Sequence, residues 1–483
     1  MAELSGLHLF LLAVAVFMAC AFEFVNGFHD TANAVATVIY TRSLKPTFAV
    51  ILSGIFNFLG VVIGGTAVAM GIVELLPIDL LSSHSLNTSL VMVFSLLTSA
   101  IAWNLGTWYL GLPASSSHAL IGAILGIGLA HAHISNLPIL DGVNVSKVKD
   151  IALALIISPL FGFLLSAVLL FVAKKLFTNQ VFHGAPPRDK APPWIVRTLL
   201  ILTSSGVSFS HGSNDGQKGM GLIMLILIAV LPARFALSPN INISETQEII
   251  KNTELILKEN FRGALLNLNK PMKESPRAFS LIHVAEAREA GMSSSTAQET
   301  IRTKPKEFKI SNSATDDKFE LRTQILKLSQ TISKIEKQNP EVTSSPLWSK
   351  VTDNNKKLKA TTRFVPVWVV LMVALSIGLG TMIGWKRIVV TIGERIGKSH
   401  LTYAQGASAE LVAMSTIGLS AVAGLPVSTT HVLSSGIAGT MIASKSSLQG
   451  KTVKNILLAW ILTVPVCVTL SFTIFVTLFR LVG

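Results

Sequence analysis

The sequence predicts an all-α membrane protein that crosses the bilayer many times. Half of its 483 residues are hydrophobic and only 14% are charged, a balance that a water-soluble chain of this length does not sustain. The hydrophobic residues also lie in runs near or above the ~20 residues that span a bilayer core as a helix. Since backbone in hydrocarbon must satisfy its own hydrogen bonds, these runs are predicted to be helices.

The predicted membrane segments follow one another along the chain. The long runs are residues 7–24, 48–73, 89–103, 151–172, 368–383 and 456–478. Shorter candidates are residues 115–132, 194–209, 219–231, 409–424 and 428–442. Together they predict about ten to twelve crossings or half-crossings. The residues before the first run include Glu3 and no Lys or Arg, so this run is expected to be a retained span and not a secretory signal.

Charge in the short loops predicts the orientation, because basic residues resist translocation across the membrane. Arg42, Lys45 and the connections at residues 174–190 and 386–398 are basic, whereas residues 74–87 include acids and no Lys or Arg. The basic loops are therefore expected to be cytoplasmic, with the N-terminus outside. The net charge of +14 is explained by this bias and predicts no nucleic-acid partner.

A polar insert divides the membrane part of the chain. Residues 236–363 hold 36 of the 66 charged residues and no spanning run, so they must lie outside the bilayer, between membrane parts of residues 1–235 and 364–483. Hydrophobic residues at helical spacing predict one amphipathic helix there, with linker around it. These residues are Leu321, Ile325, Leu328, Ile332 and Ile335. The insert is expected to be a tether or a regulatory appendage.

Two stretches of the chain occur twice. Residues 111–126 align without gaps to residues 424–439, with eight identities in sixteen positions and Ser/Thr exchanges at two more. A weaker match joins residues 27–34 to residues 212–219. The two motifs are 84 residues apart in the first copy and 212 in the second, and the excess of 128 is the length of the insert. A duplicated membrane unit of this kind is typical of secondary transporters, whose site lies between the copies.

The weaker repeat carries polar residues at membrane depth. In the first copy, His29, Asp30 and Asn33 directly follow a hydrophobic run. An acid near the bilayer centre costs at least about 2.5–3.5 kcal/mol, so Asp30 is expected to face a cavity or a partner. In the second copy, Asn214 and Asp215 lie among glycines, and the backbone is expected to unwind there into a broken helix that binds a cation or a proton.

Other charged residues within the predicted spans have a functional and a structural interpretation. Lys218 is expected to offset the charge of the substrate or of Asp215, although a snorkelling or structurally paired lysine is the alternative. Glu410, which lies among small residues, is expected to be a coupling acid at a close helix contact. Further intramembrane candidates are Glu23, Asn57 and Asn104.

The stronger repeat predicts two hairpins that bind an oxyanion. In each copy a proline ends one segment and three hydroxyl residues begin the next: Ser115, Ser116, Ser117 and Ser428, Thr429, Thr430. A helix N-terminus offers unpaired amides, a positive dipole end and hydroxyl donors, which together bind a tetrahedral anion. His118 and His431 either fix the hairpins or relay protons, and both interpretations stay open.

These motifs, in this order, resemble the inorganic phosphate transporter (PiT) family, and most closely its bacterial low-affinity Pit permeases. The resemblance rests on Gly-x-x-Asp-x-x-Asn-Ala at residues 27–34, Gly-Ser-Asn-Asp at residues 212–215 and the two Gly-Leu-Pro-x-Ser-[ST]-[ST]-His hairpins. It covers residues 1–235 and 364–483, and the insert stands where the family is expected to have its large cytoplasmic loop.

The resemblance implies an inverted-repeat fold, an elevator or rocking mechanism and cation-driven symport of phosphate, with no cofactor and with a homodimer as a further expectation. It assigns the substrate and coupling-ion region to Asp30, Asn33, Asn214 and Asp215, and phosphate to Ser115, Ser116, Ser428 and Thr429. Many sodium-coupled members read Gly-Ala-Asn-Asp where this chain reads Gly-Phe-His29-Asp30. His29 therefore favours coupling to H⁺, with phosphate carried as a neutral complex with a divalent cation such as Mg²⁺.

Three rival functions are weighed against this reading. A sodium-coupled phosphate permease, or a sulphate or arsenate permease, would use the same fold, because helix ends and hydroxyls recognise a tetrahedral shape. A passive channel would conduct without coupling. An intramembrane hydrolase is not expected, because the sequence has no nucleophile elbow, zinc-binding pair or other reaction-specific arrangement.

Overall fold

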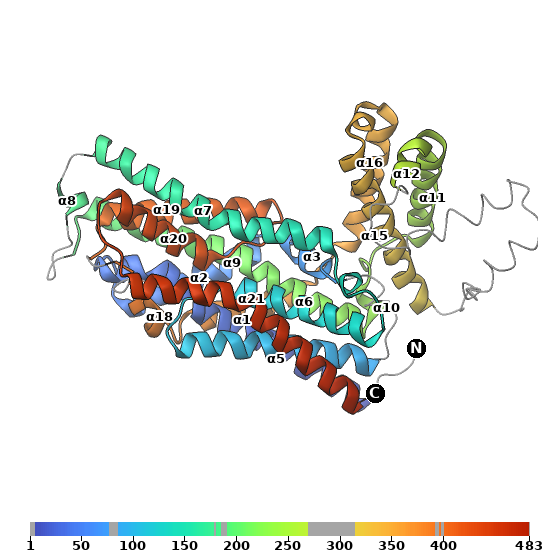
Figure 1. Ribbon diagram of the computed structural model, residues 1–483, viewed down its shortest axis with the longest axis horizontal. Coiled ribbons are helices and arrows are strands. Elements are labelled where there is room, and N and C mark those ends of the chain that lie inside the picture. Colours follow the sequence, from blue (N-terminus) through green and yellow to red (C-terminus); the bar gives the residue numbers. More distant parts are fainter. Residues whose placement is uncertain are drawn as a thin grey trace, which may run out of the picture. The chain divides into compact units, whose positions relative to one another are not determined.

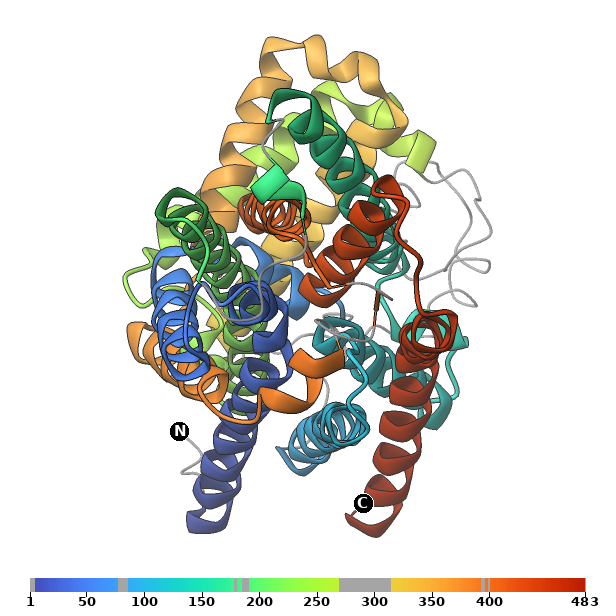
Figure 2. The ribbon, with the colours of Figure 1, turned by 90° about the vertical axis from the view of Figure 1, so that its left-hand side faces the viewer.

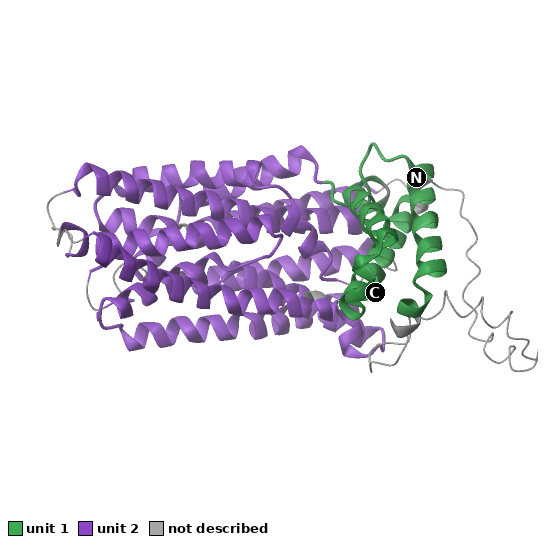
Figure 3. Cartoon of the chain, turned by 90° about the horizontal axis from the view of Figure 1, so that it is seen from above, with its two compact units in different colours: residues 1–2, 231–364 green, residues 3–230, 365–483 purple. Residues whose placement is uncertain are grey.

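The computed structural model describes residues 5–76, 86–177, 180–184, 191–268, 314–391, 396–397 and 400–482. These residues are mostly helical, and within them only an isolated bridge between Gly397 and Leu448 has β geometry. The chain forms two compact units, one of residues 3–230 and 365–483 and the other chiefly of residues 231–364 (Figure 3). We call the first the membrane unit and the second the insert unit.

The membrane unit is a bundle of long helices that run side by side (Figure 1; Figure 2 looks at the ends of several of them). Its helices are α1 (Gly6–Tyr40), α2 (Pro46–Ile63), α3 (Ala67–Val73), α5 (Leu86–Tyr109), α6 (Ser116–Ile134), η1 (Ile139–Gly142), α7 (Val145–Leu176), α8 (Gln180–His183), α9 (Trp194–Val230), α17 (Val367–Thr381), α18 (Lys386–Val390), α19 (Tyr403–Val422), α20 (Thr429–Ala443) and α21 (Gly450–Val482).

Six helices of the described residues are long and apolar enough to cross a membrane, namely α1, α2, α5, α6, α7 and α21. A seventh span results when α17 is taken together with the helix before it. The helices α9, α19 and α20 carry the polar motifs and are buried along much of their length. The prediction of an all-α, multi-pass membrane protein is confirmed, and the higher predicted number of segments included such polar and short helices.

The expected broken helix around Asp215 is wrong, because α9 runs without interruption from Trp194 to Val230. The glycines there allow neighbouring helices to come close instead of unwinding the backbone. A Cβ atom at Gly212 would collide with the carbonyl oxygen of Asn57, and one at Gly219 would lie 2.6 Å from Cδ of Glu23. The two predicted segments at residues 194–209 and 219–231 are therefore one helix.

Glycines pack α1 against α17 and α2 against α9 in the same way. At each crossing, one glycine from either helix approaches a carbonyl oxygen of the other so closely that no side chain fits. The glycines and the residues whose oxygens they approach are Gly27 and Ile377, Gly380 and Phe24, Gly212 and Asn57, and Gly60 and Phe209. Gly27 and Gly212 hold equivalent places in the sequence repeat, so the two copies reuse one packing contact.

The equivalent helices α1 and α9 run antiparallel. Ala34 of α1 lies beside Ser204 of α9, whereas Glu23 lies beside Gly219. The start of α1 and the end of α9 therefore lie at the same side of the membrane unit. This direction of the two helices is what an inverted repeat requires.

That antiparallel pair corrects the predicted orientation. The chain leaves the membrane unit after Val230, on the side where α1 begins, so the N-terminus and the insert share one side of the membrane. An outside N-terminus and a cytoplasmic insert exclude each other. Because Arg42, Lys45 and Arg197 lie at the opposite ends of these helices, basic charge favours an outside N-terminus, and we then expect the start of the insert outside as well.

The insert unit has a hydrophobic core of its own. Its helices are α10 (Pro232–Phe235), α11 (Ile243–Asn260), α12 (Arg262–Leu268), α15 (Ala314–Gln338), η3 (Pro340–Ser344) and α16 (Pro346–Thr362). The predicted amphipathic helix is confirmed as α15, and its five hydrophobic residues are buried. The expectation of linker is wrong for α11 and α16, because Ile250 and Leu257 of α11 and Trp348 of α16 complete the core. Residues 269–313, for which linker was also expected, lie outside the described residues.

Candidate functional site

Two hairpins of the membrane unit end in matching helix N-termini. Gly111 and Gly424 have φ angles of +66° and +70° and turn the chain after α5 and α19, a conformation that glycine adopts without strain. The hydroxyls of Ser115 and Ser428 then each accept a hydrogen bond of 3.2 Å from the amide three residues on, and so cap α6 and α20. The prediction of two helix N-termini at these serines is confirmed.

The two hairpin tips meet each other. Ser117 donates to the carbonyl oxygen of Val427 at 3.1 Å, and the rings of His118 and His431 lie 4.5 Å apart. His431 also stacks on Trp460, with ring centroids 3.9 Å apart. These contacts support the hairpin-fixing interpretation of the two histidines, while a proton relay stays a prediction.

Asp30 of α1 accepts hydrogen bonds from the second hairpin. Thr430 donates to Oδ1 of Asp30 at 2.6 Å and Thr429 donates to Oδ2 at 3.3 Å. Nδ1 of His29 lies 3.3 Å from Oδ1, and Nε2 of the same ring lies 3.2 Å from the Thr107 hydroxyl. Because these side chains are buried, the carboxylate is held by polar contacts instead of water.

Asp215 of α9 is linked to the first hairpin through Lys218. The ammonium nitrogen of Lys218 lies 2.6 Å from Oδ1 of Asp215, 2.5 Å from the Ser117 hydroxyl and 2.9 Å from the carbonyl oxygen of Val427. All of these side chains are buried, so the ion pair is shielded from solvent. The buried pair offsets the charge of Asp215, which agrees both with the predicted charge-offsetting role and with the alternative of a structurally paired lysine, whereas a snorkelling lysine would be exposed.

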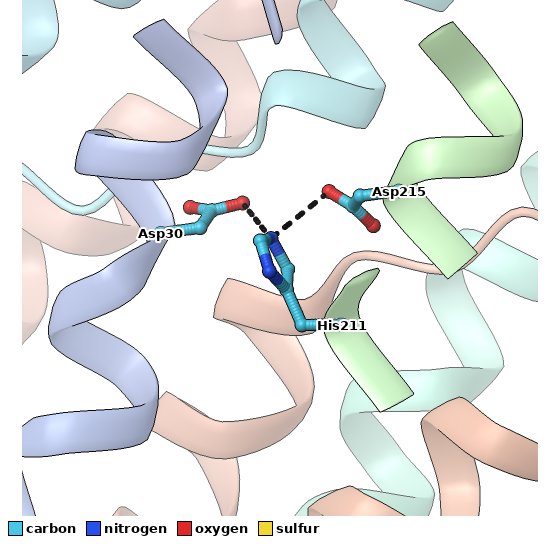
Figure 4. A group of neighbouring side chains, drawn as sticks. All are labelled: Asp30, His211 and Asp215. Carbon is cyan, nitrogen blue, oxygen red and sulfur yellow. Dashed lines mark ion pairs between the residues drawn. The ribbon is translucent and has the colours of Figure 1, made fainter. Parts of the chain in front are cut away.

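His211 lies between the two carboxylates, as Figure 4 shows. Its Nε2 is 3.7 Å from Oδ2 of Asp30 and 3.5 Å from Oδ2 of Asp215. Its Nδ1 is 2.7 Å from Oδ1 of Asn57, whose amide nitrogen donates to Thr381. Since an amide oxygen only accepts, Nδ1 carries the proton of this bond and directs Nε2 toward the acids. One ligand atom from each of the three residues lies within 4.8 Å of the other two, a spacing that suits a metal ion.

The other predicted site residues lie in different surroundings. Asn214 donates to the Ser420 hydroxyl and to the carbonyl oxygen of Leu425, and so anchors the turn of the second hairpin. Glu410 is buried and accepts a hydrogen bond of 2.5 Å from Thr203. Ser116 is buried, and its hydroxyl has no hydrogen-bond partner among the described residues. The side chain of Asn33 lies outside the described residues.

Sequence reasoning missed His211 and Asn26 as members of the site. His211 stands four residues before Asp215 and Asn26 stands four before Asp30, so each faces the same side of its helix as its acid. These two residues also hold equivalent positions in the repeat. The i,i+4 spacing before both aspartates was therefore a signal that points to them.

The chain matches the profile of the phosphate transporter family over residues 26–471. It is 44% identical over 481 residues to the low-affinity inorganic phosphate transporter of Buchnera aphidicola subsp. Acyrthosiphon pisum (strain APS), with 96% of each chain covered. It is 43% identical over 503 residues to the low-affinity inorganic phosphate transporter PitA of Escherichia coli (strain K12), with 95% of each chain covered.

A solved structure titled "The sodium-dependent phosphate transporter" has a similar fold, with a TM-score of 0.52 and 21% identity over 98% of this chain and 100% of that one. At that identity the likeness concerns the fold alone. The family match extends over most of the chain, and both relatives cover almost its whole length. The chain therefore belongs to the phosphate transporter family.

Proposed function

We propose that this phosphate transporter is a symporter that carries inorganic phosphate into the cell as a neutral complex with a divalent cation, driven by the proton gradient. The observation that carries the proposal is the meeting of two helix N-termini with two buried carboxylates and a histidine. The first group of elements suits an oxyanion and the second suits a cation. We therefore assign the complex of the two to their junction.

Phosphate is assigned to the hairpin tips. Their hydroxyl residues are Ser115, Ser116 and Ser117 in the first hairpin and Ser428, Thr429 and Thr430 in the second. Ser115 and Ser428 cap their helices and so fix the amides that would face the anion. The unpartnered hydroxyl of Ser116 is a ready donor, and Asn214 holds the second turn in place.

The divalent cation, as part of the cargo, is assigned to Asp30, His211 and Asp215. Carboxylate oxygens suit Mg²⁺, and the imidazole also suits transition metals. The bond from Nδ1 of His211 to Asn57 is the second contact that a metal-binding histidine commonly makes. Asp30, Asp215 and Lys218 carry one net negative charge, and a neutral complex leaves that charge unchanged, which limits the cost of moving it through a low dielectric.

Proton coupling is assigned to the predicted coupling acids Asp30, Asp215 and Glu410, with Glu410 as the residue whose surroundings suit it best. One oxygen of Glu410 accepts from Thr203, and the other has no hydrogen-bond partner among the described residues. A buried carboxyl group without a cation is accommodated more easily with its proton than without it. Roles of His29 and Asn33 in coupling, and assembly into a homodimer, stay predictions from the family resemblance.

Phosphate uptake into proteoliposomes tests the proposal. We would impose either a pH gradient or a sodium gradient, with and without Mg²⁺, on the wild-type chain and on Asp30→Asn. Asp353→Asn, at an exposed site of the insert unit, is the matched control. Uptake that needs both the pH gradient and the metal, and that Asp30→Asn loses, supports the proposal. Uptake that follows sodium alone contradicts proton coupling, and stronger uptake of sulphate than of phosphate contradicts the substrate.

A further inference from the structure

Glu23 is a buried acid of the membrane unit to which the proposed function gives no role. It lies on α1, two turns before Asp30, and its side chain is fully buried. Oε2 accepts a hydrogen bond of 3.2 Å from Asn26, and Oε1 has no hydrogen-bond partner among the described residues. A buried charge in that state would be costly, since a single neutral amide is its only partner there.

Helix packing keeps Glu23 in this place. A Cβ atom at position 219 would lie 2.6 Å from Cδ of Glu23, so a larger residue there would displace the carboxyl group from its place against α9. The same helix brings Asp215 next to Asn26, whose amide donates to Oδ2 of Asp215 at 3.3 Å. Asn26 therefore shares its two amide hydrogens between Glu23 and Asp215.

Glu23 and Asp215 differ in the charged groups around them. Those whose charge acts on Glu23 are Asp215, Lys218 and His211, all on α9, and Cys20 lies one turn earlier on α1. Lys218 pairs with Asp215 at 2.6 Å, and Glu23 has no ion pair among the described residues. Asn26 donates hydrogen bonds to both acids, but of the two only Asp215 has a cation partner among the described residues.

We propose that Glu23 is a proton-binding site of the transport cycle, linked through Asn26 to the state of Asp215. This inference rests on the proposed proton coupling. Glu23 holds its proton while Lys218 stays on Asp215. Cargo binds in this protonated state, at Oδ2 of Asp215, while Lys218 stays on Oδ1. After the cargo has left on the inner side, Lys218 or the shared amide shifts toward Glu23, and Glu23 releases its proton there. Glu23 binds another proton on the outer side when Lys218 returns to Asp215, so one proton moves inward with each cargo.

The test separates exchange of phosphate from its accumulation. Glu23→Gln mimics the permanently protonated acid and keeps the bond from Asn26 possible. Under a pH gradient, we expect Glu23→Gln to accumulate at least about tenfold less phosphate than the wild-type chain. The variant should still exchange labelled for unlabelled phosphate across the liposome membrane. The rate of exchange by Glu23→Gln should also depend less on pH than the rate of exchange by the wild-type chain. The titration of phosphate affects both proteins equally, so it does not cause this difference. Glu245→Gln, an exposed acid of the insert unit, is the matched control.

Several outcomes would overturn the inference. Wild-type accumulation in Glu23→Gln contradicts it. An equal loss of exchange and accumulation in a variant that melts at the wild-type temperature also contradicts it, because Glu23 would then serve the binding or movement of cargo and not the proton. If Glu23→Gln does not fold, Glu23→Asp serves, since it keeps an ionisable group but shortens its reach to Asn26. Accumulation by Glu23→Asp with an unchanged pH profile contradicts the inference. If the wild-type chain follows sodium instead of protons, the proposed coupling fails first, and this result is seen without any variant.

Discussion

The hydroxyl of Thr430 donates to Oδ1 of Asp30 at 2.6 Å and so ties the second hairpin to the helix of the first motif. The equivalent residue of the first hairpin, Ser117, contacts Lys218, which in turn pairs with Asp215. Each hairpin is therefore bound to the aspartate of the other copy. Movement of one hairpin tip must break a contact to a buried acid, so occupancy of the acids and position of the hairpins are linked.

Removal of the Thr430 hydroxyl tests this link. We expect Thr430→Val to raise the KM for phosphate about tenfold or more, because a hydrogen bond to a charged group contributes about 1.5–3 kcal/mol. Thr430→Ser keeps the hydroxyl and should restore the wild-type KM. Initial rates of phosphate uptake over a range of concentrations measure the effect. Equal KM values for the Val and Ser variants would show that the bond is irrelevant to cargo binding.

Loss of the Lys218 ammonium should act first on stability. Lys218→Met leaves Asp215 buried without its ion-pair partner, and breaking a buried pair from one side costs about 3–5 kcal/mol. Thermal unfolding in detergent should show a lower melting temperature for Lys218→Met and a partial recovery for the double variant Lys218→Met, Asp215→Asn. Transport should stay absent in both. A double variant no more stable than Lys218→Met would mean that Lys218 does not act through Asp215.

The sequence predicted the elements of the site better than their arrangement. The hairpins at Ser115 and Ser428 were predictable because proline, glycine and capping hydroxyls act locally. The acids Asp30 and Asp215 were predictable because a charged residue at membrane depth is costly and is therefore expected to have a functional role. The contact of Thr430 with Asp30 joins residues 400 positions apart, and no local pattern encodes it.

The glycines of α9 show why the remainder was not predictable. Gly212 and Gly216 permit either an unwound backbone or a close helix crossing, and the choice depends on the partner helix. Here α2 supplies a carbonyl oxygen at Asn57 and the side chain of Val61, so the crossing prevails. His211 was overlooked for a related reason, because its role depends on two acids from different helices.

Close crossing makes Gly212 a sensitive position. Gly212→Ala places a methyl group against the carbonyl oxygen of Asn57, which also holds His211 through its side chain. We expect a lower melting temperature and a loss of transport. Gly106→Ala in α5 is the matched control, because no atom lies within 4 Å of the added Cβ, and it should be neutral or stabilising by about 0.5–1 kcal/mol. Similar losses in both variants would contradict the packing argument.

The side of the membrane that the insert occupies can be measured with introduced cysteines. The antiparallel course of α1 and α9 places the start of the insert on the side of the N-terminus, and the basic residues at the other ends of these helices favour the cytoplasm for that other side. In a Cys20→Ser background, in which Cys467 stays buried, Ser349→Cys of the insert unit should react with a membrane-impermeant maleimide in intact cells. Ser447→Cys, which follows α20 on the opposite side, should react only after the membrane is opened.

The reverse labelling pattern would place both the insert and the N-terminus in the cytoplasm. Labelling of both cysteines in intact cells would contradict the helix directions, because these directions place the two positions on opposite faces of the membrane.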